Sequence, residues 1–132
     1  VFGAVYKLAA LENPDGTIVP KIKLSENTSK ITTPHFKKVY RYYDRATGKA
    51  LADEMCLHDE TVDTAAPHTI FDPAETWKTK TLENFDAREL LVPIFKDGKQ
   101  VYTSPSAKEI RAYCLAQIDT LWVFRRSFGT LR

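Results

Sequence analysis

The fold of this chain is set by Val19-Pro20-Lys21-Ile22-Lys23-Leu24-Ser25-Glu26-Asn27, in which apolar and polar side chains alternate. Such alternation predicts a strand with one buried face, here over residues 17–25. A second β-rich run covers residues 4–12. Between them, Asn13-Pro14-Asp15-Gly16 predicts a hairpin turn, because Pro fixes φ and Gly accepts a positive φ. Pro20 has no N–H to donate, so this position must lie at an edge or a bulge.

Further strands are predicted along the rest of the chain. After a polar loop over residues 26–36, residues 37–44 are rich in β-branched and aromatic side chains, and a Thr47-Gly48 turn leads to a strand over residues 49–57. Downstream, the predicted strands cover residues 76–82, 89–96 and 99–102. The last two flank Asp97-Gly98, the strongest short hairpin signal in the chain.

A helix is predicted to begin at Ala107. Ser106 and Glu109 have the spacing of a capping box, in which each residue satisfies a backbone N–H of the other. The apolar positions of the helix recur at the spacing of one buried stripe: Ile110, Cys114, Ile118, Leu121 and Trp122. The fold class predicted from these patterns is α+β, mainly antiparallel strands and hairpins with a C-terminal amphipathic helix.

The bulk properties fit a small soluble protein without a polyanionic partner. The 132 residues are 43% hydrophobic, enough to form the core of one domain or of two small lobes. The net charge of +2 is too balanced to demand a nucleic-acid partner, and none is predicted. Cys56 and Cys114 lack the close spacing of a disulfide framework, and no apolar run approaches the ~20 residues that cross a membrane. We expect a cytoplasmic protein with reduced thiols and no membrane partner.

An acidic stretch without periodicity marks the best candidate boundary. It covers residues 58–66 and is followed by Pro67 and Pro73. We therefore divide the chain into a β-rich segment, residues 1–58, and a hairpin-plus-helix lobe, residues 67–132. The apolar start at Val1-Phe2, without an initiator Met, is typical of a truncated chain.

Lysines and tyrosines are interleaved in the first half of the chain, which leaves two interpretations open. The set consists of Lys21, Lys23, Lys30, Lys37, Lys38, Tyr40, Arg41, Tyr42 and Tyr43. Aromatic faces can stack on bases while lysines neutralise phosphates, which would make a phosphate or nucleic-acid surface. Alternatively, strand alternation simply turns the lysines toward solvent on a two-faced sheet.

Other chemistry-bearing residues do not form a recognisable site. Cys56, His58, Asp59 and His68 are metal-ligand types, but only Cys56 and His58 are closely paired, so no metal site is predicted. Adjacent carboxylates at Asp53 and Glu54 point to opposite faces of a strand. No nucleophile or phosphate-loop signature is present, and no catalytic residue is predicted. The aromatic side chains Trp77, Phe85, Phe95 and Trp122 are expected in the core.

Several motifs, taken in order, resemble the bacterial nicotinate phosphoribosyltransferases. The quoted run and the Lys30, Thr33-Pro34 and 37–41 segments that follow it match that family's pattern. The remaining matches are Ala4-Val5-Tyr6-Lys7-Leu8, Phe85-Asp86-Ala87, Leu90-Leu91-Val92-Pro93-Ile94-Phe95-Lys96-Asp97-Gly98-Lys99, Pro105-Ser106 and Glu109-Ile110-Arg111-Ala112-Tyr113. In that family these elements follow the catalytic barrel.

The resemblance implies that the chain is a C-terminal fragment of a type II phosphoribosyltransferase. Residues 1–58 would complete a sandwich domain of the intact enzyme. That enzyme would be a homodimer that forms nicotinate mononucleotide from nicotinate and phosphoribosyl diphosphate, with ATP and Mg²⁺, in NAD biosynthesis. The fragment itself is expected to need no cofactor, to be inactive and to have the remainder of the parent chain as its partner. Lys23, Lys30 and Lys37 are the candidates for contact with the small-molecule substrates.

The chain departs from the family pattern in two places, and one rival function stays open. The family usually has Thr-Pro-Gly before the lysine, whereas this chain has Thr33-Pro34-His35-Phe36-Lys37, so that turn lacks the free φ of a glycine. Residues 123–129 also differ from the family's helical extension. The rival function is a stand-alone antiparallel binding module for nucleic acid or a protein partner.

Overall fold

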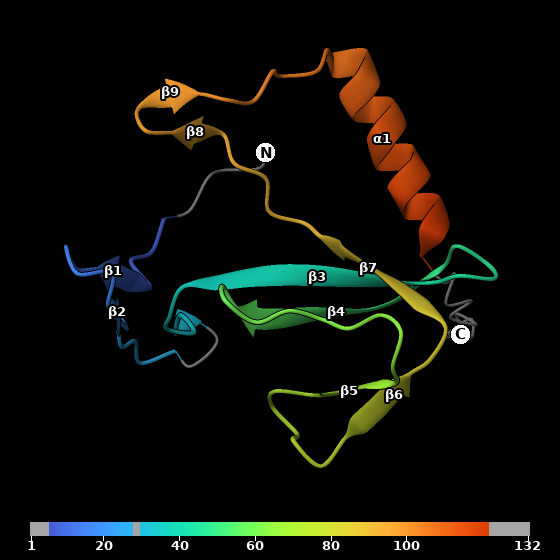
Figure 1. The fold of residues 1–132 in the computed structure, drawn as a ribbon, viewed down its shortest axis with the longest axis horizontal. Helices are drawn as coiled ribbons and strands as arrows, with labels where there is room; N and C mark the ends of the chain where they lie inside the picture. The colour runs from blue at the N-terminus through green and yellow to red at the C-terminus, as the bar shows by residue number, and fades with distance from the viewer. Residues whose placement is uncertain (1–5, 28–29, 122–132) are drawn as a thin grey trace, which may run out of the picture. The chain divides into compact units, whose positions relative to one another are not determined.

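The computed structural model describes residues 6–27 and 30–121 as short antiparallel strands followed by one helix (Figure 1). The elements are β1 (Ala10–Glu12), β2 (Ile18–Pro20), β3 (Lys37–Asp44), β4 (Ala50–Leu57), β5 (His68–Phe71), β6 (Thr79–Leu82), β7 (Phe85–Glu89), β8 (Phe95–Lys96), β9 (Lys99–Gln100) and α1 (Ala107–Thr120). The predicted α+β class is confirmed. None of the described helices has the length and apolar character needed to span a membrane.

The chain forms two compact units, each made of two separate stretches of sequence. One unit contains residues 1–39 and 55–61, and the other contains residues 40–54 and 62–132. Strands β3 and β4 contribute residues to both units. The assignment of residues 1–58 to a sandwich domain and of 67–132 to a separate lobe stays a prediction about the intact protein.

The first hairpin forms around the predicted turn but is shorter than predicted. The Gly16 N–H donates to the Asn13 carbonyl at 2.9 Å, and Gly16 has the expected positive φ of 83°. Pairing joins only β1 and β2, so residues 6–9 and 21–25 are not strands, while residues 4 and 5 lie outside the described part. Pro20 pairs with Ala10. The Asn13 N–H donates to the Thr17 carbonyl, and the Lys21 N–H donates to the Ala9 carbonyl. In an antiparallel pair, hydrogen-bonded and non-hydrogen-bonded positions alternate, so Ala10 and Pro20 form a non-hydrogen-bonded pair. The Pro20 nitrogen therefore points away from β1, toward the edge, as predicted.

The central sheet has the order β4-β3-β7. The predicted strands over 37–44 and 49–57 are confirmed within one residue, and Gly48 makes the turn between them with φ 66°. Strand β7 pairs antiparallel with β3, placing Tyr42 beside Ala87. The prediction of a strand over 89–96 was wrong, because pairing occurs earlier, at Phe85–Glu89, and later only at β8. A further strand that was not predicted, β5, pairs with β6.

A small aromatic core lies in the second unit. Tyr42, Leu82 and Phe85 are at most 2% exposed, and the rings of Tyr42 and Phe85 meet edge to face with centroids 5.3 Å apart. Cys56, in the first unit, is also buried. The prediction was wrong for Trp77 and Phe95, which are 73% and 68% exposed because the β5–β6 and β8–β9 hairpins turn them toward solvent. Trp122 lies outside the described residues.

Helix α1 begins as predicted but its apolar stripe is not buried. The Ser106 hydroxyl accepts from the Glu109 N–H, and the Glu109 carboxylate accepts from the Ser106 N–H, so the capping box is present. However, no described residue of the helix is buried, and Ile118 is 54% exposed. The prediction of a buried stripe was therefore wrong.

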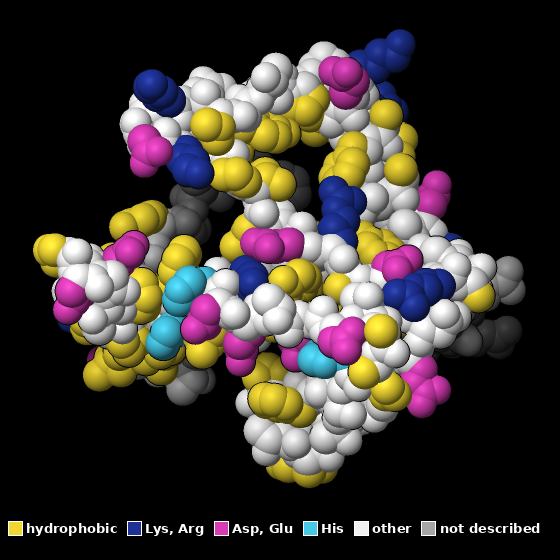
Figure 2. All heavy atoms as spheres, viewed as in Figure 1, with side chains coloured by type: hydrophobic (Ala, Val, Ile, Leu, Met, Phe, Trp, Pro, Cys, Tyr) yellow, Lys and Arg dark blue, Asp and Glu magenta, His cyan; other side chains and the backbone are white. Residues whose placement is uncertain are grey.

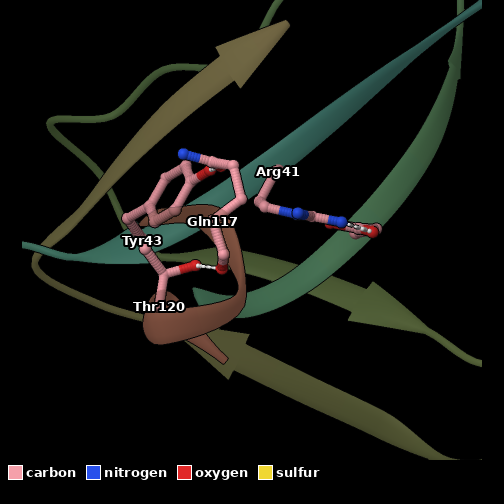
Figure 3. A network of polar contacts seen from close by, with 5 residues as sticks. Arg41, Tyr43, Gln117 and Thr120 are labelled. Atoms are coloured by element: carbon pink, nitrogen blue, oxygen red, sulfur yellow. Dashed lines mark hydrogen bonds and ion pairs between the residues drawn. The ribbon is translucent and has the colours of Figure 1, made fainter. Parts of the chain in front are cut away.

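Polar side chains make the contacts between α1 and the central sheet (Figure 3). The Tyr43 hydroxyl, on β3, donates to Gln117 Oε1 at 2.9 Å, and within the helix Thr120 Oγ1 donates to the Gln117 carbonyl at 2.7 Å. The Arg88 guanidinium, on β7, lies over the Tyr113 ring at 5.4 Å. The helix thus meets the sheet through hydrogen bonds and a cation–π contact.

Candidate functional site: a lysine-lined pocket

A pocket with a volume of about 740 Å³ lies in the first unit, beside the β1–β2 hairpin. Three stretches of chain supply its lining. These are residues 6–8 before β1, residues 21–25 after β2, and Lys30. Four of the lining side chains are lysines: Lys7, Lys21, Lys23 and Lys30. The lining also includes the apolar side chains of Tyr6, Leu8, Ile22 and Leu24.

Backbone hydrogen bonds hold these stretches together. The Ala9 carbonyl accepts from the N–H of Lys21 and from the N–H of His35, each at 2.8 Å. The hairpin register pairs Ala10 with Pro20, and both Lys7 and Lys23 line the pocket beyond this pair. The Lys7 ammonium also donates to the Lys30 carbonyl. A short hairpin therefore gathers lysines that are far apart in sequence.

The pocket is electropositive, and its lining contains no acidic side chain. Within residues 6–27 and 30–121, no salt bridge involves any of the four lysines. Ammonium groups with flexible stems can follow the oxygens of a phosphate or carboxylate, while the stems and the apolar lining cover a flat apolar moiety. The arrangement suits a small anion with several charges and an apolar part.

The structure brings together two of the three predicted lysines. Lys23 and Lys30 line the pocket, whereas the Lys37 ammonium donates to the carbonyls of Thr33 and Pro34, the latter at 3.1 Å, and does not line it. The role of all three in substrate binding stays a prediction. Lys7 was missed, although the hairpin predicted around the Asn13–Gly16 turn contains both Lys7 and Lys23.

The interleaved tyrosines do not share a surface. Successive residues of β3 point to opposite faces, so Tyr40 and Tyr42 lie on one face and Tyr43 on the other. Tyr42 is fully buried, and its hydroxyl donates to Glu54, while the Tyr43 hydroxyl is bonded to α1. Tyr42 is therefore unavailable for stacking on a base.

The acidic candidates also lie on opposite faces, as predicted. Asp53 forms two 2.7 Å hydrogen bonds with Arg41, and these bonds raise the pKa of the guanidinium above its usual value (Figure 3). Glu54 instead faces Tyr42 and accepts from His68 Nε2 at 2.8 Å. The two carboxylates have separate structural partners and do not converge on one reacting atom.

The residues considered as metal ligands do not gather into a site. Cys56 is buried, and the His58 ring stacks on Phe36 with centroids 4.6 Å apart. His68, in the other unit, is occupied with Glu54. In the described ranges, no group of three or more His, Cys, Asp or Glu side chains could hold a metal ion.

Comparison with known proteins gives consistent matches. A family model described as the nicotinate phosphoribosyltransferase C-terminal domain matches residues 36–127. The nicotinate phosphoribosyltransferase of Bacillus subtilis (strain 168) is 38% identical over 120 residues, which is 91% of this chain and 24% of that protein. An alignment of that length must extend into the segment before residue 36 that contains the pocket lysines.

Two eukaryotic proteins with the same name are also similar. That of Caenorhabditis elegans is 33% identical over 84% of this chain and 19% of its own length. That of Dictyostelium discoideum is 27% identical over 89% of this chain and 20% of its own length. The chain thus spans about a fifth to a quarter of the length of the relatives it matches.

Proposed function

The chain belongs to the nicotinate phosphoribosyltransferase C-terminal domain family, and from this premise we propose that it is the C-terminal region of a nicotinate phosphoribosyltransferase. The observation that carries the proposal is the 38% identity over 91% of the chain to the Bacillus subtilis protein of that name. The order of the sequence motifs, which follow the catalytic barrel in the family they resemble, supports the same placement.

The proposed parent enzyme joins nicotinate to phosphoribosyl diphosphate, releasing diphosphate and forming nicotinate mononucleotide for NAD biosynthesis in the cytoplasm. ATP hydrolysis would be coupled to this step. Mg²⁺ is expected in such an enzyme, but the described residues of this chain include no cluster of carboxylates that could bind it. We therefore give this chain no role in metal binding. The ion and the reacting groups would be held by the remainder of a homodimeric parent.

The role that we assign to this chain is electrostatic. Phosphoribosyl diphosphate carries three phosphoryl groups, and the pocket lysines Lys7, Lys21, Lys23 and Lys30 present four positive charges on a largely apolar lining. Charges of this kind bind phosphates and lower the free energy of a leaving diphosphate. They supply no nucleophile and no general base, so the chain alone should not catalyse the transfer.

The test is to express the longer reading frame that contains this chain beside the 132-residue chain alone. Each protein is incubated with nicotinate, ATP, Mg²⁺ and phosphoribosyl diphosphate, and nicotinate mononucleotide is measured. We expect product only from the longer protein. The proposal is overturned if the longer protein is inactive with nicotinate, and the assignment of a non-catalytic role is overturned if the chain alone makes product.

The rival function, a stand-alone binding module, loses its main support in the structure. It depended on a shared surface of tyrosines and lysines, yet Tyr42 is buried and Tyr43 is bonded to α1. Fluorescence anisotropy with a labelled single-stranded oligonucleotide would restore it if binding were tight at physiological salt.

A further inference from the structure

Helix α1 carries an apolar stripe that the described part of the chain leaves uncovered. Ile110, Ile118 and Leu121, the C-cap, are 53%, 54% and 45% exposed, and Cys114, between them on the same face, is exposed as well. Figure 2 shows hydrophobic side chains at the surface over this helix. The residues recur at intervals of three and four positions, so they form one continuous strip.

This stripe is not the side by which the helix contacts the sheet. Tyr113 and Gln117 face the sheet, through the Arg88 and Tyr43 contacts. At about 100° per residue, the centre of that face and the centre of the stripe differ by roughly a quarter turn. Both faces can therefore be occupied at once, the first by the sheet and the second by another surface.

The lengths of the relatives indicate what occupies the stripe. The matched region is the C-terminal domain of proteins of which it forms 19% to 24%, so most of each relative has no counterpart here. A covalently attached segment has a high effective concentration, which favours docking over association with free partners. A helix with a stripe of this width normally packs it against a core.

We propose that the stripe Ile110, Cys114, Ile118 and Leu121 is the docking face for the N-terminal remainder of the parent polypeptide. This inference rests on the proposed function. It specifies that the partner is covalently connected and apolar, and that α1 contacts the sheet on one face and that partner on the neighbouring face.

Cys114 lies within the stripe, so the reactivity of its thiol measures whether the stripe is covered. In the 132-residue chain its thiol should react quickly with N-ethylmaleimide, whereas Cys56, only 8% exposed, should react slowly. In the longer protein we expect Cys114 to become protected by about tenfold or more, since a tenfold slowing corresponds to about 1.4 kcal/mol of opening free energy. Peptide mass spectrometry follows each thiol, and Cys56 is the internal control.

A substitution on the stripe supplies a second, independent measurement. Ile118→Lys should leave the melting temperature of the 132-residue chain nearly unchanged and lower that of the longer protein. Ala112→Lys is the matched control, because Ala112 is exposed on the opposite side of the helix and should affect neither protein.

Each alternative outcome is distinguishable. An active longer enzyme in which Cys114 reacts as fast as in the chain overturns this inference and leaves the proposed function standing. Protection that appears in the chain alone as its concentration rises identifies a second copy as the occupant and also overturns it. A longer protein without activity on nicotinate overturns the proposed function, whatever the labelling shows.

Discussion

His35 holds a backbone conformation that residues with a Cβ rarely adopt. Its φ is 93°, and its N–H is committed to the Ala9 carbonyl at 2.8 Å, the same acceptor that fixes Lys21 beside the pocket. The sequence has His35 where the related family usually has Gly, and in the structure this residue nevertheless has a positive φ. In addition, His35 Nδ1 is buried and has no hydrogen-bond partner among the described residues. The residue therefore carries both strain and an unsatisfied polar atom.

Two substitutions of His35 should separate the destabilisation caused by backbone strain from that caused by the buried Nδ1 atom. Both His35→Gly and His35→Ala remove the imidazole, but only the glycine variant removes the Cβ that disfavours a positive φ. We expect the glycine variant to be more stable than the alanine variant by about 1 kcal/mol. Urea denaturation of both variants measures the difference, and an alanine variant at least as stable as the glycine variant would show that the backbone is not strained.

Single residues were predictable where strand alternation alone decides. Asp53 and Glu54 were placed on opposite faces, and the structure gives them separate partners, Arg41 and Tyr42. The same rule separates Tyr42 from Tyr43. By contrast, the exposure of Trp77 could not be predicted, because burial requires another element to pack over the β5–β6 hairpin. The size and aromatic character of a side chain do not show whether such an element is present.

At the scale of elements, the start of α1 depends on the ionised form of Glu109. The side-chain and backbone hydrogen bonds from Ser106 hold the pKa of this carboxyl below its usual value. A depressed folded-state pKa means that the stabilisation is present above the ordinary glutamate pKa, near 4.3, and is lost as the pH falls through the lower folded value. We expect Glu109→Gln to flatten this acid dependence of helix content. Far-ultraviolet circular dichroism across that range is the measurement, and an unchanged profile would exclude the capping role.

The exposed stripe and the buried core should respond differently to truncation. Leu82→Ala removes a side chain that is 2% exposed and should destabilise the chain by about 2 to 5 kcal/mol. Ile118→Ala removes a side chain that is 54% exposed and should change stability by no more than about 0.5 kcal/mol. Denaturant midpoints of the two variants test this, and a large loss for Ile118 would mean that the stripe is already covered in the chain.

Elements with a local chemical signal were predictable, and those defined by distant partners were not. The turn at residues 13–16, the Asp97-Gly98 turn and the Ser106 capping box each depend on neighbours within a few positions, and all three are present. Strand β7 exists because it pairs with β3, more than forty positions earlier. The helical period of the stripe was read correctly, but periodicity does not identify what covers an apolar face.

At the scale of the whole molecule, antiparallel pairing explains why the compact units interrupt the sequence. Residues 40–54 form a hairpin that belongs to the same compact unit as residues 62–132. Strand β7 pairs with the edge of this hairpin, and side chains of β5 and β6 pack against Tyr42. An acidic stretch with flanking prolines marked a plausible boundary, but composition cannot show which earlier strands a later segment will pair with. The lysine pocket, in contrast, falls within one unit and is built almost entirely by one hairpin and the loop after it.

The positions of Lys30 and Lys37 lead to opposite expectations in the longer enzyme. Lys30 lines the pocket, so Lys30→Ala should raise KM for phosphoribosyl diphosphate by about fivefold, the effect of losing roughly 1 kcal/mol of a partly solvated charge interaction. Lys37 instead bonds the carbonyls of Thr33 and Pro34, so Lys37→Ala should lower the melting temperature and leave KM nearly unchanged. Steady-state kinetics and thermal unfolding of both variants distinguish a binding lysine from a structural one. Unaltered KM in the Lys30 variant would assign the pocket lysines to the solvated surface, because a charge that contacts a triply phosphorylated substrate cannot be removed without weakening its binding.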